Sequence, residues 1–208
     1  MKITNPLDKI LDNESKIKVL RFLFKTNAEW NGRQIAKEIG VSPATTHKAL
    51  RGLNREGILS LRNMGKTYVY TLNQDNFTVA NMLKPLFVSE DKLMNHILGI
   101  IRKEIAASTI KNSISSVALF GSVSARKDNA ASDIDLIVIV RDIKTKVAAG
   151  FLFEEIDKRI SKELGNTVSA YINTETELRV KYKKGVSIIR NIIRENHLIY
   201  GEPVERLL

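Results

Sequence analysis

The sequence predicts a protein of mixed α and β structure, α/β or α+β in class, with two domains. Two observations lead to this prediction. In the first seventy residues, apolar residues recur at helical spacing and are followed by an alternating strand pattern. Further along, residues 114–120 and 136–140 form short apolar runs typical of strands. The second domain is therefore expected to hold a mixed sheet flanked by helices.

The composition is that of a folded and basic protein. Hydrophobic residues make up 43% and charged residues 27% of the 208 residues, which excludes a disordered chain. The absence of cysteine excludes disulfides and thiolate metal sites. No apolar stretch is long enough to cross a membrane, and the N-terminus lacks the apolar core of a signal peptide. A cytoplasmic protein without a membrane partner is therefore expected.

Positive charge is concentrated near the N-terminus. Residues 1–72 carry 13 Lys and Arg against 6 Asp and Glu, a net charge of +7, and the other 136 residues carry only +3. A basic segment favours a polyanionic partner, because each cation near a phosphate displaces a condensed counterion. Charge alone does not separate this interpretation from an ordinary basic surface.

Three helices are expected in this basic segment, over residues 14–26, 32–39 and 43–56. Gly40 ends the second helix, and Ser42 with Pro43 begins the third. Two helices joined by so short a turn form a helix-turn-helix, in which the second helix lies in the major groove of DNA.

A basic hairpin follows, with strands expected at residues 58–62 and 67–72. This order of elements resembles the winged-helix domains of bacterial and archaeal transcriptional regulators. The resemblance implies double-stranded DNA as a partner, although winged helices also bind proteins. The residues that would face bases and phosphates are Thr45, Thr46, Lys48 and Arg51 on the helix, and Arg62 and Lys66 on the hairpin.

The polar stretch at residues 73–76 suggests a domain boundary. Ser89 is expected to cap a helix that continues to Ala107. The predicted organisation is a winged-helix domain at 1–74, a linker at 75–89 and a second domain at 90–208. The helix after Ser89 could pack on the second domain or form a homodimer interface, and its spacing does not separate the two.

A pair of motifs in the second domain indicates phosphate chemistry. The strand that ends at Phe120 runs into Gly121 and Ser122, and ten residues later Asp133 and Asp135 open the next strand. Two aspartates at positions i and i+2 of a strand point to the same side. Such a pair suits Mg²⁺ held together with substrate phosphates. The glycine would let the backbone approach a phosphate closely, and the Ser122 hydroxyl would donate to it.

The spacing Gly-Ser, ten residues, Asp-x-Asp resembles the minimal nucleotidyltransferases of the polymerase-β-type superfamily. By this resemblance Gly121, Ser122 and Arg126 would bind the nucleotide, and Asp133 and Asp135 would be catalytic and hold Mg²⁺. A nucleoside triphosphate, with ATP as the expected one, would transfer its nucleoside monophosphate to a hydroxyl of a protein, an RNA or a small molecule. Lys127 departs from the glycine that is usual in the motif.

A third acidic residue, usual on a later strand of active relatives, is not found where it is expected. In the strand at residues 167–172, Ser169 and Tyr171 occupy the side on which that acid would lie. Two functions therefore stay open. The first is a Mg²⁺-dependent nucleotidyltransferase that carries a DNA-binding domain. The alternative is a transcriptional regulator whose second domain is catalytically degenerate and serves as a nucleotide sensor or a dimerisation platform.

Overall fold

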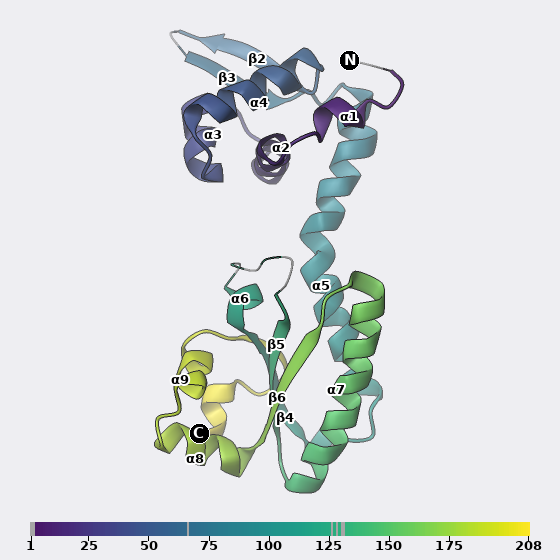
Figure 1. The fold of residues 1–208 in the computed structure, drawn as a ribbon, viewed down its shortest axis with the longest axis vertical. Coiled ribbons are helices and arrows are strands. Elements are labelled where there is room, and N and C mark those ends of the chain that lie inside the picture. The colour runs from purple at the N-terminus through teal and green to yellow at the C-terminus, as the bar shows by residue number, and fades with distance from the viewer. Residues whose placement is uncertain (1–2, 66, 126, 128, 130–131) are drawn as a thin grey trace. The chain divides into compact units, whose positions relative to one another are not determined.

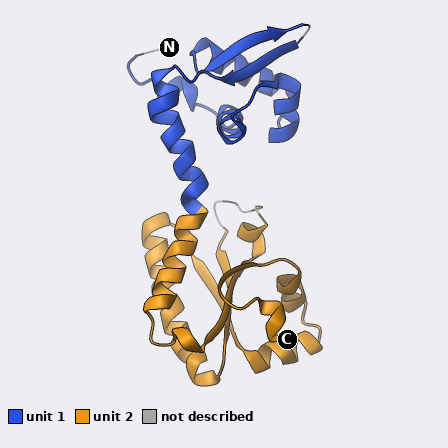
Figure 2. Ribbon diagram, turned by 180° about the vertical axis from the view of Figure 1, so that it is seen from behind, with its two compact units in different colours: residues 1–93 blue, residues 94–208 orange. Residues whose placement is uncertain are grey.

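The computed structural model describes residues 3–65, 67–125, 127, 129 and 132–208. The chain divides into two compact units, residues 1–93 and residues 94–208 (Figure 2), and each is described by itself. Within the described residues, no helix has the length and apolar character needed to cross a membrane.

Unit 1 packs helices against a small sheet (Figure 1), and the predicted mixed α and β class is confirmed. Its sheet has the strand order β1-β3-β2, and β2 and β3 form an antiparallel hairpin. The elements are α1 (Leu7–Ile10), α2 (Glu14–Thr26), β1 (Trp30–Asn31), α3 (Gly32–Ile39), α4 (Pro43–Arg55), β2 (Leu59–Met64), β3 (Thr67–Leu72) and the π-helical turn η1 (Val79–Leu83).

The turn between α3 and α4 forms as predicted. Gly40 ends α3 with a φ of 64°, in the left-handed region that glycine adopts without strain. The side chain of Ser42 accepts a hydrogen bond from the Thr45 backbone N–H at 3.2 Å, and Pro43 occupies the first helical position. These signals are local, which is why the sequence alone located both helices.

The segment predicted as a linker at residues 75–89 is helical from residue 77 on, and Ser89 does not cap a helix. The Asn76 side chain instead accepts hydrogen bonds from the backbone N–H groups of Thr78 and Val79 at 2.9 and 3.3 Å, so the helix begins there. It continues through η1 into α5 (Lys84–Ala107). Pro85 lacks an N–H and crowds the carbonyl four residues earlier, and the π-helical turn just before it accommodates both effects. The predicted domain boundaries themselves stay a prediction.

Unit 2 is a four-stranded mixed sheet with strand order β6-β5-β4-β7, in which only the β5–β6 pair is parallel. The mixed sheet and its flanking helices were predicted and are confirmed (Figure 1). Besides the end of α5, its elements are η2 (Lys111–Ser113), β4 (Ile114–Phe120), α6 (Gly121–Ser124), β5 (Ile134–Val140), α7 (Ile143–Leu164), β6 (Val168–Thr174), α8 (Glu175–Lys183), α9 (Ser187–Arg194), β7 (His197–Gly201) and η3 (Val204–Leu207).

The two faces of this sheet form separate hydrophobic cores. Leu136 and Val138 of β5 point to the face that α5 and α7 cover. Ile137 and Ile139 point to the opposite face, where Leu178 of α8 packs together with residues of α9. Because side chains alternate along a strand, Asp135 belongs to the face of α8 and α9.

Candidate functional site

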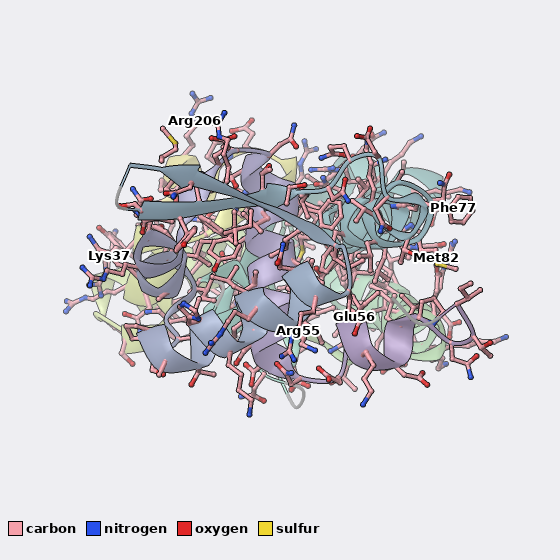
Figure 3. The ribbon with its side chains drawn as sticks, turned by 90° about the horizontal axis from the view of Figure 1, so that it is seen from above. Lys37, Arg55, Glu56, Phe77, Met82 and Arg206 are labelled. Atoms are coloured by element: carbon pink, nitrogen blue, oxygen red, sulfur yellow. The ribbon has the colours of Figure 1, made fainter. Side chains whose placement is uncertain are left out.

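The first candidate site is the outer surface of α4 in unit 1. Lys48 and Arg51 are exposed there, as is Thr45, whose hydroxyl accepts a hydrogen bond from Ser42 at 2.8 Å. Figure 3 labels two further exposed cations of this unit, Lys37 on α3 and Arg55 on α4. The helix therefore presents a basic surface around the residues that the sequence predicted.

Thr46 is not part of that surface, and its prediction as a DNA contact is wrong. Its side chain is fully buried, with 0% of the residue exposed to solvent. Thr46 precedes Ala49, Leu50 and Leu53 at intervals of three, four and seven residues, so it continues the apolar stripe of α4 into the core. Its hydroxyl has no hydrogen-bond partner among the described residues.

Arg62 lies on β2 of the hairpin and is engaged by an acid that the sequence analysis did not consider. One of its guanidinium N–H groups donates to Glu29 Oε2 at 2.6 Å, and both side chains remain largely exposed. The two residues are 33 positions apart, and no local signal predicts such a pair. Lys66 lies outside the described residues.

The second candidate site is the edge of the sheet in unit 2 where β4 ends and β5 begins. Phe120 and Asp135 are paired in the antiparallel register, so Gly121 follows directly beside the Asp135 carboxylate. Gly121 has a φ of 77°, and a Cβ built there would collide with that carboxylate. Only glycine satisfies both conditions without strain. The glycine of the motif therefore keeps the space in front of Asp135 open.

Two acids, Asp133 and Asp135, adjoin at this edge. Burial raises the pKa of Asp135 above its usual range, and the neighbouring charge of Asp133 raises it further. Asp133 is exposed, and its carboxylate accepts a hydrogen bond from the Thr167 hydroxyl. Both aspartates are hard oxygen donors of the kind that a divalent cation such as Mg²⁺ prefers. They are the residues of this edge that could hold such a cation.

The position next to Asp135 on the neighbouring strand is Ser169. The parallel register of β5 and β6 pairs these two residues, and Ser169 is exposed. Within the described part of the chain, no group of three or more His, Cys, Asp or Glu residues is placed to hold a metal ion. The register therefore places a serine beside Asp135 on β6.

Ser122 and Arg126 are the two further residues of the predicted nucleotide site. Ser122 is half-buried in α6, directly after Gly121. Arg126 lies outside the described residues. Thr167, in contrast, was not predicted, because a threonine in the loop before a strand carries no signal until the strands are paired.

Two family models match the chain. Residues 103–204 match the family described as polymerase beta, nucleotidyltransferase, and residues 17–62 match the IclR helix-turn-helix domain. A comparison with curated protein sequences gave no match.

Solved structures that match part of the chain include HlyU, a winged helix-turn-helix domain and a toxin–antitoxin. Reduced HlyU from Vibrio cholerae is 22% identical, with a TM-score of 0.35, and the match covers 42% of this chain and 84% of HlyU. The homodimeric winged helix-turn-helix DNA-binding domain of Mb0332 from Mycobacterium bovis is 23% identical, with a TM-score of 0.36, and the match covers 44% and 81%. A toxin–antitoxin solved with AMP-PNP is 19% identical, with a TM-score of 0.35 and coverage of 53% and 79%.

Proposed function

We propose that the chain, which matches family models of a helix-turn-helix domain and of a polymerase-beta nucleotidyltransferase, is a DNA-binding, Mg²⁺-dependent nucleotidyltransferase. In this proposal α4 and the hairpin bind double-stranded DNA in the cytoplasm. The edge at Gly121 and Asp135 binds a nucleoside triphosphate, with ATP as the expected one. A nucleoside monophosphate is then transferred to a hydroxyl group of an acceptor.

The observation that supports the nucleotide site most is the pair of carboxylates beside Gly121. Holding Asp135 half-buried next to Asp133 disfavours its ionised form, as the raised pKa of Asp135 indicates. Such an arrangement destabilises the folded protein unless a ligand compensates it. A cation bound with phosphates would do so, because it neutralises both carboxylates at once.

Each residue of the edge has a specific part in this proposal. Asp133 and Asp135 would hold Mg²⁺, which when bound neutralises charge on the phosphates during transfer. The Ser122 hydroxyl would donate to a phosphate oxygen. Thr167, by donating to Asp133, fixes the direction in which that carboxylate faces. Ser169 stands where a third acid would accept the proton of the attacking hydroxyl, and its own hydroxyl is a poor base.

Ser169 is also the observation that favours the second candidate function. Without a third carboxylate, the site would still bind a nucleotide and a cation, but transfer would be slow or absent. The chain would then be a transcriptional regulator that senses a nucleotide, or that uses unit 2 for association with a second copy.

The decisive experiment is isothermal titration of the full chain with ATP, GTP, CTP and UTP, with and without Mg²⁺. Binding of at least one nucleotide that requires Mg²⁺ and disappears in Asp133→Asn/Asp135→Asn is expected. The matched control is Glu154→Gln/Glu202→Gln, which removes two exposed acids elsewhere in unit 2 and should bind as the wild type does. If none of the four nucleotides binds, the proposed nucleotide site is wrong.

Transfer separates the two candidate functions. The wild type is incubated with nucleotide labelled at the α-phosphate and with total cellular RNA or protein as acceptor. Label that becomes attached to either acceptor, and that the double aspartate variant does not attach, supports the enzyme. Tight Mg²⁺-dependent binding without any transfer supports the regulator.

A further inference from the structure

A strongly basic surface covers part of unit 2 away from the carboxylates. Between residues 178 and 194, which form most of α8, the following turn and α9, the sequence holds six cations and no acid. Five of them are exposed and Lys181 is half-buried. We call this the α8–α9 basic surface, and its cations are Arg179, Lys181, Lys183, Lys184, Arg190 and Arg194.

This charge is not a general property of the unit. Residues 94–208 carry 18 Lys and Arg and 14 Asp and Glu, so without the basic surface they would carry 12 cations against 14 acids, a net charge of −2. Some cations elsewhere in unit 2 are paired, for example Lys146 with Glu177 at 2.7 Å and Lys158 with Glu155 at 2.6 Å, and within the surface Arg179 lies 3.5 Å from Glu175. No ion pair between described residues uses Lys183, Lys184 or Arg190. A cluster of six cations in which these three have no acidic partner attracts a polyanion.

The basic surface lies on the same face of the sheet as the Asp135 side chain, because Leu178 of α8 packs on Ile137 and Ile139 of β5. Figure 1 shows α8 and α9 together on that side, opposite α7. Its cations therefore lie on the face to which the Asp135 side chain belongs and not on the face that α5 and α7 cover.

The C-terminal end of α9 leads toward the edge that holds the carboxylates. Arg194 is the last residue of α9, and three residues later His197 begins β7, paired with Leu119 of β4. Leu119 directly precedes Phe120, the register partner of Asp135.

The chemistry of the surface fits a single-stranded nucleic acid. Tyr182, which stands between Lys181 and Lys183 in the sequence, is 42% exposed. Ile188 on α9 is 38% exposed. An exposed aromatic ring among cations offers a base a stacking surface while the cations bind the phosphates. An acidic protein partner would use the cations but would have no specific need for the ring.

We propose that the α8–α9 basic surface binds a single-stranded polynucleotide and that a hydroxyl of this strand is the acceptor, a proposal that rests on the function above. In the transfer, the strand's hydroxyl oxygen forms a bond to the α-phosphorus of the nucleoside triphosphate. The bond from that phosphorus to the bridging oxygen breaks, pyrophosphate leaves, and the hydroxyl proton passes to water.

The test measures binding of fluorescein-labelled twelve-nucleotide RNA and DNA strands to the full chain by fluorescence anisotropy. An excess of unlabelled duplex DNA occupies the winged helix. The variant is Lys183→Gln/Lys184→Gln/Arg190→Gln, and the matched control is Lys103→Gln/Lys144→Gln/Lys162→Gln, three exposed cations of unit 2 outside the surface. Tighter binding of the RNA than of the DNA would identify the ribose as part of the recognition, and equal binding would identify the shared backbone.

The surface variant should lose about tenfold or more in affinity for the strand. The slope of log affinity against log salt should fall by about 2, because each phosphate contact of a single strand contributes about 0.7. The control should stay within about twofold of the wild type. Equal losses in the two variants would show an effect of net charge and overturn the proposal, as would an undiminished affinity in the surface variant.

The same proteins separate this inference from the proposed function. Asp133→Asn/Asp135→Asn should still bind the strand, and the surface variant should still bind nucleotide with Mg²⁺ in the titration above. Strand binding that depends on the surface, in a protein that binds no nucleotide, would overturn the proposed function and the strand's role as acceptor but not the strand-binding surface. If the protein binds nucleotide but the surface variant binds the strand as tightly as the wild type does, the inference alone is wrong.

Discussion

The two candidate sites of this chain are built in opposite ways. In unit 1, Lys48 and Arg51 stand on the outside of a helix whose other side forms the core, so neither side chain takes part in the fold. In unit 2, Gly121 and Asp135 lie where two strands meet: Gly121 occupies a position that only glycine fits, and Asp135 is held half-buried beside Asp133. Substitution in unit 1 should therefore change the affinity for DNA but not the free energy of unfolding. Substitution in unit 2 should change both the affinity for nucleotide and the free energy of unfolding.

The largest effect is expected at Gly121. Gly121→Ala places a side chain at a φ of 77° and against the Asp135 carboxylate, so we expect the free energy of unfolding to fall by about 1–3 kcal/mol. Nucleotide binding should be lost as well. Urea unfolding of the full chain measures the first effect, and the titration above measures the second.

Gly150→Ala is the matched control for that substitution. Gly150 lies within α7, and a Cβ there would meet no atom within 4 Å. Alanine in a helix interior is favoured over glycine by about 0.5–1 kcal/mol, so this variant should be more stable than the wild type. If both variants lost stability equally, the close approach of Gly121 to Asp135 would not be the cause.

The next effect concerns the exposed cations of α4. Lys48→Gln/Arg51→Gln should lower the affinity for duplex DNA by about tenfold or more and reduce the salt slope by about 2, because each phosphate contact contributes about 0.9. Urea unfolding should be unchanged within about 0.5 kcal/mol. Anisotropy with labelled duplexes at several salt concentrations checks the first expectation. A salt-insensitive, weak interaction would instead favour a winged helix that binds a protein.

The same comparison explains what the sequence could predict. The helix bounds of α2 and α3, and the start of α4, depend on caps and spacing within a few residues, and these local signals determined them. Thr46 was misassigned because threonine is more often exposed than buried. Its spacing to Ala49, Leu50 and Leu53 was the signal that places it on the inward side of α4.

In unit 2 the motif identified the residues, but the sheet decides what they contact. The pairing of Asp135 with Ser169 and the hydrogen bond from Thr167 to Asp133 depend on register between segments more than thirty residues apart. The long helix was missed for a similar reason. Ser89 was expected to cap a helix, and the π-helical turn that carries the helix past Pro85 has no signal in the sequence.

A smaller effect is expected from Thr46→Val, which tests the inward side of α4. Valine has nearly the same shape and removes a buried hydroxyl that has no partner among the described residues. We expect the free energy of unfolding to rise by about 1 kcal/mol, because an unsatisfied buried polar group is destabilising. The affinity for duplex DNA should not change. A loss of DNA affinity in this variant would restore Thr46 to the binding surface.

The smallest effect is expected from Asp135→Asn in the absence of Mg²⁺. Since burial and then Asp133 raise the pKa of Asp135 in the folded protein above its usual value of 3.8, the unfolded chain loses this proton first as the pH rises. Between the pKa of Asp135 in the unfolded state and its pKa in the folded state, the folded state binds more protons, so its stability falls as the pH rises. Above both pKa values the loss of stability is constant. The asparagine variant lacks this deficit and should melt about 1–3 °C higher than the wild type at pH 7.

At a pH below 3.8, where the aspartate is protonated in both states, the two proteins should melt alike. Adding Mg²⁺ with nucleotide at pH 7 should raise the Tm of the wild type alone, because a ligand stabilises only the state that binds it. The exposed acid Glu202 provides the control, and Glu202→Gln should leave the melting temperature unchanged at both pH values. A variant at Asp135 that melts below the wild type at pH 7 without Mg²⁺ would mean that this carboxylate stabilises the edge. The edge of unit 2 would then lack the destabilising carboxylate that distinguishes it from the surface of α4.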